Sequence, residues 1–231
     1  MVVIKLPSRF AHYNEEETLI ERYGLESINF KIWKGYNIKP TNTVICLVNY
    51  GDGIKLEKFY WAKHTPQDIQ KARAETVTEK KMFAKSFAER RCVLLAHGFF
   101  EWKKVKDGGR TTSKPHYFKL KNDEHFAVAG LYWLPHKNDD KDRNRMIIIT
   151  VEANEIAAEV FHRMPAILVG GEIEQYLDMN LESDVAKNLL KTYPADFMEY
   201  YEVENLVSKG DRTANTIVPK GQVKGGLDDF F

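Results

Sequence analysis

The chain has 231 residues, and its 34 lysines and arginines are balanced by 33 aspartates and glutamates, a formal net charge of +1. This balance excludes a protein that attracts nucleic acid over its whole surface, while a hydrophobic content of 43% is enough for the core of one globular domain. No apolar stretch approaches the roughly 18 residues of a membrane-spanning helix, and no signal peptide is recognisable, so we expect an intracellular protein with no membrane partner.

The first half of the chain reads as a helix, a hairpin and a second helix. Asn14 is placed to cap a helix that ends at Gly24, since acidic residues follow the asparagine and glycine commonly follows a last helical turn. The runs TVICLV (43–48) and KLEKFYWA (55–62) predict two strands joined by a GDG turn. Thr78 is then expected to start a helix that runs to about residue 89.

The second half predicts mostly strands and then short helices. Two polar segments, KVKDGGRTTSK (104–114) and PHKNDDKDRN (135–144), are expected to be exposed loops between strands. The predicted strands are RRCVLLA (90–96), GFFEWKKV (98–105), HYFKLK (116–121), HFAVAGLYWL (125–134) and RMIIITV (145–151). The predicted helices are EANEIAAEV (152–160), IEQYLDM (173–179) and SDVAKNLLKTY (183–193), the last with a serine cap.

Strands and helices alternate without a βαβ rhythm, so the pattern favours an α+β fold with a largely antiparallel sheet. We expect a single domain over residues 1–208 and a flexible tail over 209–231, where apolar periodicity is lost. Cys46 and Cys92 lie in apolar runs, which favours buried, inert thiols over a disulfide or a metal site. No metal or other cofactor is predicted.

Glu101 stands out because it lies among Phe99, Phe100 and Trp102 in RRCVLLAHGFFEW (90–102). An apolar setting would raise its pKa into the range useful for proton transfer. Strand alternation offers the alternative that Phe99 and Glu101 face one side, and that the carboxylate is simply solvated. His162, in FHRMPAIL, is likewise either a catalytic base or an ordinary surface histidine.

A local excess of basic residues lies between Lys63 and Arg91, with eight basic against four acidic side chains. Such a patch would hold a phosphate backbone, and nearby Trp61 and Phe83 would stack on bases. The alternative is a solvated helix face beside core aromatics.

Four segments occur in order along the chain: SRF (8–10), KARAET (71–76), RRCVLLAHGFFEW (90–102), and IIITVEAN (147–154) followed by HRMPAIL (162–168). Together they resemble the SOS-response-associated peptidase family, the abasic-site-processing domain. The resemblance implies an α+β domain with a curved, barrel-like sheet flanked by helices, and a positively charged groove for single-stranded DNA. In that family an N-terminal cysteine forms a thiazolidine with the opened abasic sugar, assisted by an asparagine, a glutamate and a histidine, and a peptidase role was also inferred.

The family's proton-handling glutamate matches Glu101. Four positions that look DNA-facing by the same resemblance are Arg9, Arg73, Trp102 and Arg163.

The family's reactive cysteine does not carry over. Its position is Pro7 or Val2, depending on the alignment, while Lys71 replaces the asparagine and Phe161 falls on the histidine. We therefore predict binding of single-stranded or abasic DNA without a thiazolidine crosslink. The alternatives are a lyase or crosslinking enzyme that uses the amine of Val2 or Lys71 with Glu101, and an adaptor that does not bind DNA. Lys71 is a candidate both for catalysis and for DNA binding.

The C-terminal peptide KGGLDDFF (224–231) resembles the short motifs that bind sliding clamps. Leu227, Phe230 and Phe231 would form its hydrophobic plug. A different replication partner, or a tail that folds back on the domain, are the alternatives.

Overall fold

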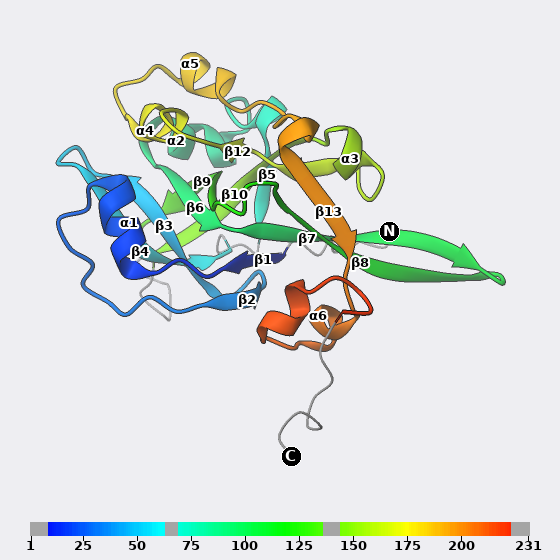
Figure 1. The fold of residues 1–231 in the computed structure, drawn as a ribbon. Coiled ribbons are helices and arrows are strands. Elements are labelled where there is room, and N and C mark those ends of the chain that lie inside the picture. Colours follow the sequence, from blue (N-terminus) through cyan, green and yellow to red (C-terminus); the bar gives the residue numbers. More distant parts are fainter. Residues whose placement is uncertain (1–8, 63–68, 136–143, 223–231) are drawn as a thin grey trace.

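The computed structural model describes residues 9–62, 69–135 and 144–222, and it is dominated by strands (Figure 1). The helices are α1 (Glu16–Tyr23), α2 (Lys81–Glu89), α3 (Glu155–Ala158), α4 (Glu172–Leu177), α5 (Ser183–Asn188) and α6 (Leu206–Lys209). The strands are β1 (Arg9–His12), β2 (Gly35–Ile38), β3 (Thr43–Asn49), β4 (Ile54–Trp61), β5 (Lys71–Arg73), β6 (Arg91–Ala96), β7 (Gly98–Asp107), β8 (Arg110–Leu120), β9 (Phe126–Trp133), β10 (Arg145–Glu152), β11 (Arg163–Pro165), β12 (Ile167–Leu168) and β13 (Met198–Glu202).

The larger sheet closes on itself. Its order is β11-β10-β4-β3-β6-β9-β12, and an additional β10–β9 pairing joins both ends of the central five strands into a ring. β10 is the central strand of this sheet, because it pairs with β4, β9 and β11 and, in parallel, with β5. Closure removes exposed strand edges and surrounds a continuous apolar core. The expected α+β single domain with a curved, largely antiparallel sheet is confirmed.

The smaller sheet has the order β13-β8-β7-β1-β2, and β6 and β7 are separated only by His97 where the chain passes from one sheet to the other. Gly98 at this crossing is required by packing. A Cβ at Gly98 would lie 2.3 Å from Cζ of Tyr117 and 2.5 Å from the carbonyl oxygen of Phe118.

The segment 104–114, predicted as a loop, is instead a long β-hairpin. β7 and β8 pair continuously from Gly98↔Lys119 to Asp107↔Arg110, and the arm projects away from the rest of the molecule (Figure 1). Gly108 and Gly109 have φ values of 52° and 81°, which suits a two-residue hairpin turn. The prediction was wrong because polar residues on both faces of the arm hide the alternation of a strand.

Helix positions were predicted better than helix starts. Gly24 ends α1 in the left-handed conformation, as expected, but Glu15 rather than Asn14 precedes its first turn, because the Asn14 amide lies 3.3 Å from Nδ1 of His12. α2 begins at Lys81, not Thr78. α5 ends at Asn188, earlier than predicted, and Ser183 is its first residue rather than its cap. Within the described ranges, the structure has no helix of the length and apolarity needed to span a membrane.

Arg91 is a fully buried charge that joins two helices to the larger sheet. Its Nε donates to the carbonyl of Tyr176 at 2.7 Å, Nη1 donates to that of Phe87 at 2.9 Å, and Nη2 donates to that of Asp178. These bonds satisfy the carbonyl groups at the ends of α2 and α4.

The chain beyond residue 208 continues to pack on the smaller sheet. The Asn37 amide donates to the carbonyls of Val207, at 2.9 Å, and Asp211. Thr216 is fully buried, and its hydroxyl donates to the carbonyl of Tyr36 at 2.9 Å. The segment expected to begin a free tail at residue 209 is therefore held against the domain as far as the described residues extend, to Gln222.

Three buried histidines meet at the base of the smaller sheet. The ring centroids of His12 and His97 are 6.1 Å apart, and those of His97 and His125 are 5.8 Å apart. Desolvation lowers the pKa of His12 and His97 to about 3 and that of His125 to about 4. Tyr13 stacks on His97, and Tyr23 lies 2.8 Å from Nε2 of His125. The cluster is therefore neutral near pH 7.

Candidate nucleic-acid interface

Glu101 is buried between the two sheets. Alternation along β7 places Phe99 in the main core, stacked on Phe118, whereas Phe100 packs on Tyr117 on the opposite face. Glu101 shares the face of Phe99 and is only 6% exposed. The predicted alternation is correct, but this face is covered rather than solvated. Phe100, on the opposite face together with Trp102, does not line the carboxylate.

Lys71 of β5, in the larger sheet, is the charged group that acts electrostatically on Glu101. Desolvation raises the pKa of Glu101 to about 8, against the opposing attraction of the Lys71 ammonium. Desolvation lowers the pKa of Lys71, with Glu101 opposing this shift and the Arg163 guanidinium adding to it. Burial thus acts on both groups to favour a neutral acid beside a neutral amine.

His116 is a further buried group beside Glu101. The two residues lie directly opposite each other in the β7–β8 ladder, so their side chains share one face. His116 is 7% exposed, and desolvation lowers its pKa. Its Nδ1 lies 3.0 Å from the Lys114 carbonyl; in the neutral ring Nδ1 therefore carries the proton, and Nε2 is left as the basic nitrogen.

A cationic pocket of about 610 Å³ opens where β5, β11 and the start of α2 meet. The described residues that line it include five cations and no carboxylate, together with His162 and the apolar side chains of Met82 and Phe83. His162 lies one position after Phe161, which falls on the family's histidine, and it lines this pocket. The five cations are Lys71, Arg73, Lys80, Lys81 and Arg163.

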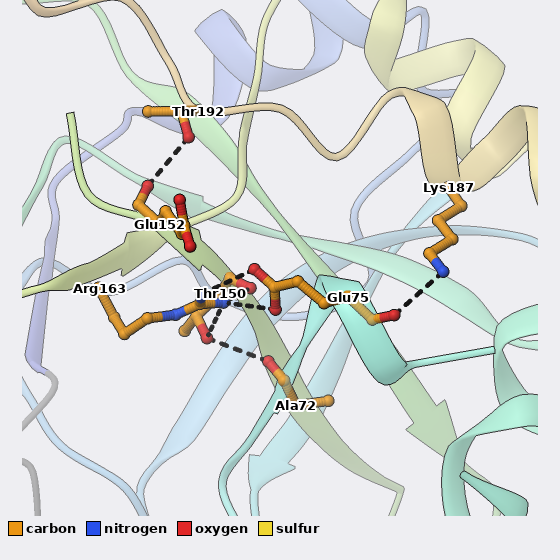
Figure 2. Close-up of polar contacts among 7 residues, drawn as sticks. All are labelled: Ala72, Glu75, Thr150, Glu152, Arg163, Lys187 and Thr192. Carbon is orange, nitrogen blue, oxygen red and sulfur yellow. Dashed lines mark hydrogen bonds and ion pairs between the residues drawn. The ribbon is translucent and has the colours of Figure 1, made fainter. Parts of the chain in front are cut away.

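Arg163 is anchored at the rim of this pocket. Its Nη1 and Nη2 donate to the two carboxylate oxygens of Glu75 at 2.7 and 3.0 Å, and Nη2 also donates to the Thr150 carbonyl (Figure 2). The Lys187 ammonium holds the backbone carbonyl of Glu75 from the other side. This bidentate pair lowers the pKa of Glu75 and fixes the position of the Arg163 guanidinium. Arg73, by contrast, is exposed at the end of β5.

Arg9 and Trp102 lie away from the pocket. The guanidinium of Arg9 is 5.5 Å from the Trp102 ring centroid, and its Nη1 donates to Oδ1 of Asn37 and to the Val207 carbonyl. The Trp102 indole donates to the Ser208 hydroxyl at 2.9 Å. The sequence-predicted residues therefore form two groups, one at the pocket and one against the C-terminal segment.

Several predicted residues lie outside the described part of the chain. These are Val2 and Pro7, at the two possible cysteine positions, and Leu227, Phe230 and Phe231 of the C-terminal peptide. Within the described ranges, no cluster of three or more histidine, cysteine or acidic side chains is arranged to hold a metal ion.

Three residues of the site are not distinguished by the sequence: Lys80, Lys81 and His116. The two lysines were only part of a general basic excess, and nothing local distinguishes them from solvated helix residues. His116 would have been found by pairing the predicted strands 98–105 and 116–121 across GG, a register that brings it opposite Glu101. The basic lining of the pocket suits an anion, and the buried Glu101 carboxyl, which interacts electrostatically with Lys71 of the lining, suits proton transfer.

Comparison with known proteins gives consistent matches over most of the chain. The family model described as SOS response associated peptidase (SRAP) matches residues 6–210. The abasic site processing protein YoqW of Bacillus subtilis is 31% identical over 211 residues, which cover 87% of this chain and 93% of the relative. The abasic site processing protein YMR114C of Saccharomyces cerevisiae is 26% identical over 96% of this chain. A crystal structure of a protein from Bacteroides thetaiotaomicron superposes with a TM-score of 0.75 at 24% identity, covering 91% of this chain and 98% of that one, and shows the same fold.

Proposed function

Because this chain belongs to the SOS response associated peptidase family, we propose that it acts in the repair of DNA at abasic sites by binding single-stranded DNA in its cationic pocket. The observation that carries this proposal is the concentration of five basic side chains around one opening of about 610 Å³. In a protein whose net charge is +1, this concentration creates the local field that a phosphate backbone requires. The relatives' names, as abasic site processing proteins, supply the substrate class.

We further propose that binding occurs without a thiazolidine crosslink, since Val2 or Pro7 occupies the cysteine position. The remaining thiols do not replace it. Cys46 and Cys92 are both fully buried, and burial raises the pKa of Cys46 far above its usual range. The same burial argues against a cysteine peptidase.

Charge reversal tests the pocket. Arg73→Glu and Lys81→Glu should each weaken binding of a fluorescent single-stranded oligonucleotide about tenfold, measured by anisotropy. They should also reduce the salt slope by about 0.7, the value for one lost phosphate contact on a single strand. Lys85→Glu is the matched control, because Lys85 is exposed on the same helix as Lys81 but does not line the pocket. Equal losses in all three variants, or no binding by the parent protein, would contradict the proposal and favour an adaptor without DNA contact.

The C-terminal peptide is proposed as a partner-binding motif for a sliding clamp. Sequence resemblance alone supports this, through Leu227, Phe230 and Phe231. A pull-down with purified clamp should capture the full chain but not a variant lacking residues 222–231. Equal capture of both would remove the clamp as a partner of this peptide.

A further inference from the structure

Of the described basic residues that line the pocket, Lys71 is the one with a resolved electrostatic interaction with a buried acid, Glu101. We propose that Lys71 is an amine nucleophile that condenses with the aldehyde of a ring-opened abasic deoxyribose and cleaves the DNA strand by β-elimination, with Glu101 as its proton-transfer partner. This inference rests on the proposed function, since the pocket must first bind abasic DNA.

The fold presents the Lys71 side chain to the opening while holding its backbone rigidly. β5 pairs in parallel with the central strand β10, with Lys71 opposite Ile148. Ala72 turns into the core at 4% exposure, so Lys71 and Arg73, two residues apart, share the pocket face. A phosphate held by Arg73 would therefore leave the adjacent sugar near the Lys71 amine.

Electrostatics favour the reactive form of both groups. Only a neutral amine attacks a carbonyl, and burial together with the Arg163 guanidinium lowers the pKa of Lys71. With its pKa raised to about 8, Glu101 is largely protonated at neutral pH and can act as a general acid. A purely structural ion pair would need both charges retained, which is the state that burial disfavours.

The reaction balances without an oxidant or a further reactant other than water. The amine of Lys71 adds to C1′, Glu101 protonates the departing hydroxyl, and water and a protonated imine result. The Glu101 carboxylate then removes a C2′ proton, and the C3′–O bond breaks as the 3′ phosphate leaves with its electron pair. Hydrolysis of the imine regenerates Lys71, and it leaves an unsaturated aldehyde on one fragment and a 5′-phosphate on the other.

Reductive trapping tests this assignment. A single-stranded oligonucleotide with one abasic site is incubated with the full chain and sodium cyanoborohydride, which reduces an imine to a stable secondary amine. We expect an adduct that peptide mass spectrometry places on Lys71. Lys71→Met, which preserves the length of the side chain, should reduce the adduct at least about a hundredfold. Lys85→Met, at an exposed lysine outside the pocket, should leave it unchanged.

Binding of the same oligonucleotide, measured in parallel, separates this inference from the proposed function. Binding without an adduct, or an adduct on the N-terminal α-amine instead of Lys71, overturns the assignment and leaves the binding function standing. Absence of both binding and adduct overturns both.

Glu101→Gln gives a second, independent readout. This variant keeps the shape of the side chain but can neither protonate the departing hydroxyl nor remove the C2′ proton, so imine trapping should become slower and strand cleavage should slow about a hundredfold. An unchanged cleavage rate would remove Glu101 from the mechanism.

Discussion

The buried histidine cluster should make the protein sensitive to mild acid. A histidine has a pKa near 6.5 in an unfolded chain, whereas the values for His12, His97 and His125 are about 3, 3 and 4 in the folded protein. The unfolded state therefore binds more protons as the pH falls below 6.5, and the folded state loses stability until the pH reaches 3 to 4. Among the described residues, Arg22 is the lysine or arginine with a resolved effect on the cluster, and it lowers the pKa of His125 further.

Glu101 opposes this trend. Its folded pKa of about 8 lies above its unfolded value, so its contribution to stability is largest at low pH and is lost between about pH 4.5 and 8. Each proton taken up by one state alone is worth about 1.4 kcal/mol per pH unit. The three histidines lower the free energy of unfolding as the pH falls, and the Glu101 carboxyl opposes them. With each group incompletely titrated, the net loss in the free energy of unfolding is about 2 to 3 kcal/mol between pH 6 and pH 5.

Urea unfolding followed by tryptophan fluorescence at pH 6 and pH 5, at constant ionic strength, measures this loss directly. His12→Leu removes one member of the cluster, and the difference between its two pH values should be smaller by about 1 kcal/mol. Comparing two pH values within one variant cancels any constant packing cost. His162→Gln, at an exposed histidine, should behave like the parent. A parent protein that loses less than about 0.5 kcal/mol over this range would refute the reasoning.

Three further predictions concern stability. Gly98→Ala should destabilise the fold by about 3 kcal/mol in thermal unfolding, because its Cβ has no space, whereas Gly171→Ala, in open space, should be nearly neutral. Arg91→Met should cost at least about 3 kcal/mol, since buried carbonyls lose their donors, and Arg90→Met, at a partly exposed position, should cost less than about 1 kcal/mol in the same assay. Thr216→Val should lower the urea midpoint by an amount equivalent to about 1 kcal/mol, and an unchanged midpoint would show that its hydroxyl bond is dispensable.

The buried part of the fold could be read from the sequence because its apolar runs are long. RMIIITV and HFAVAGLYWL correspond closely to β10 and β9, and GDG does join a hairpin. Such strands are covered on both faces, so their composition alone identifies them. The arm formed by the ends of β7 and β8 is exposed on both faces, and its polar residues therefore look like a loop.

Only part of the candidate site could be predicted, because the sequence shows which residues share a face of a strand but not what covers that face. Alternation shows that Glu101 and Phe100 face opposite sides, but it does not show which side is covered. Here both sides are covered, one by the larger sheet and the other by the segment around Val207 and Thr216. That segment lacks a long periodic element, so nothing local predicts that it packs. Asn14 illustrates the same limit, because a tertiary contact with His12 replaces the expected cap.

The attachment of the C-terminal segment also constrains the order in which the molecule can assemble. Arg9 and Asn37 bind the Val207 carbonyl, which lies 198 and 170 positions later in the chain. The N-terminal strands β1 and β2 can therefore form these bonds only after Val207 has been synthesised. Contacts between residues so far apart in the sequence slow folding and leave partly folded intermediates exposed. The larger sheet can close earlier, since its last ring strand is β10. Glu101 belongs to the smaller sheet and Lys71 to the larger, so these two side chains come together only after both sheets have formed.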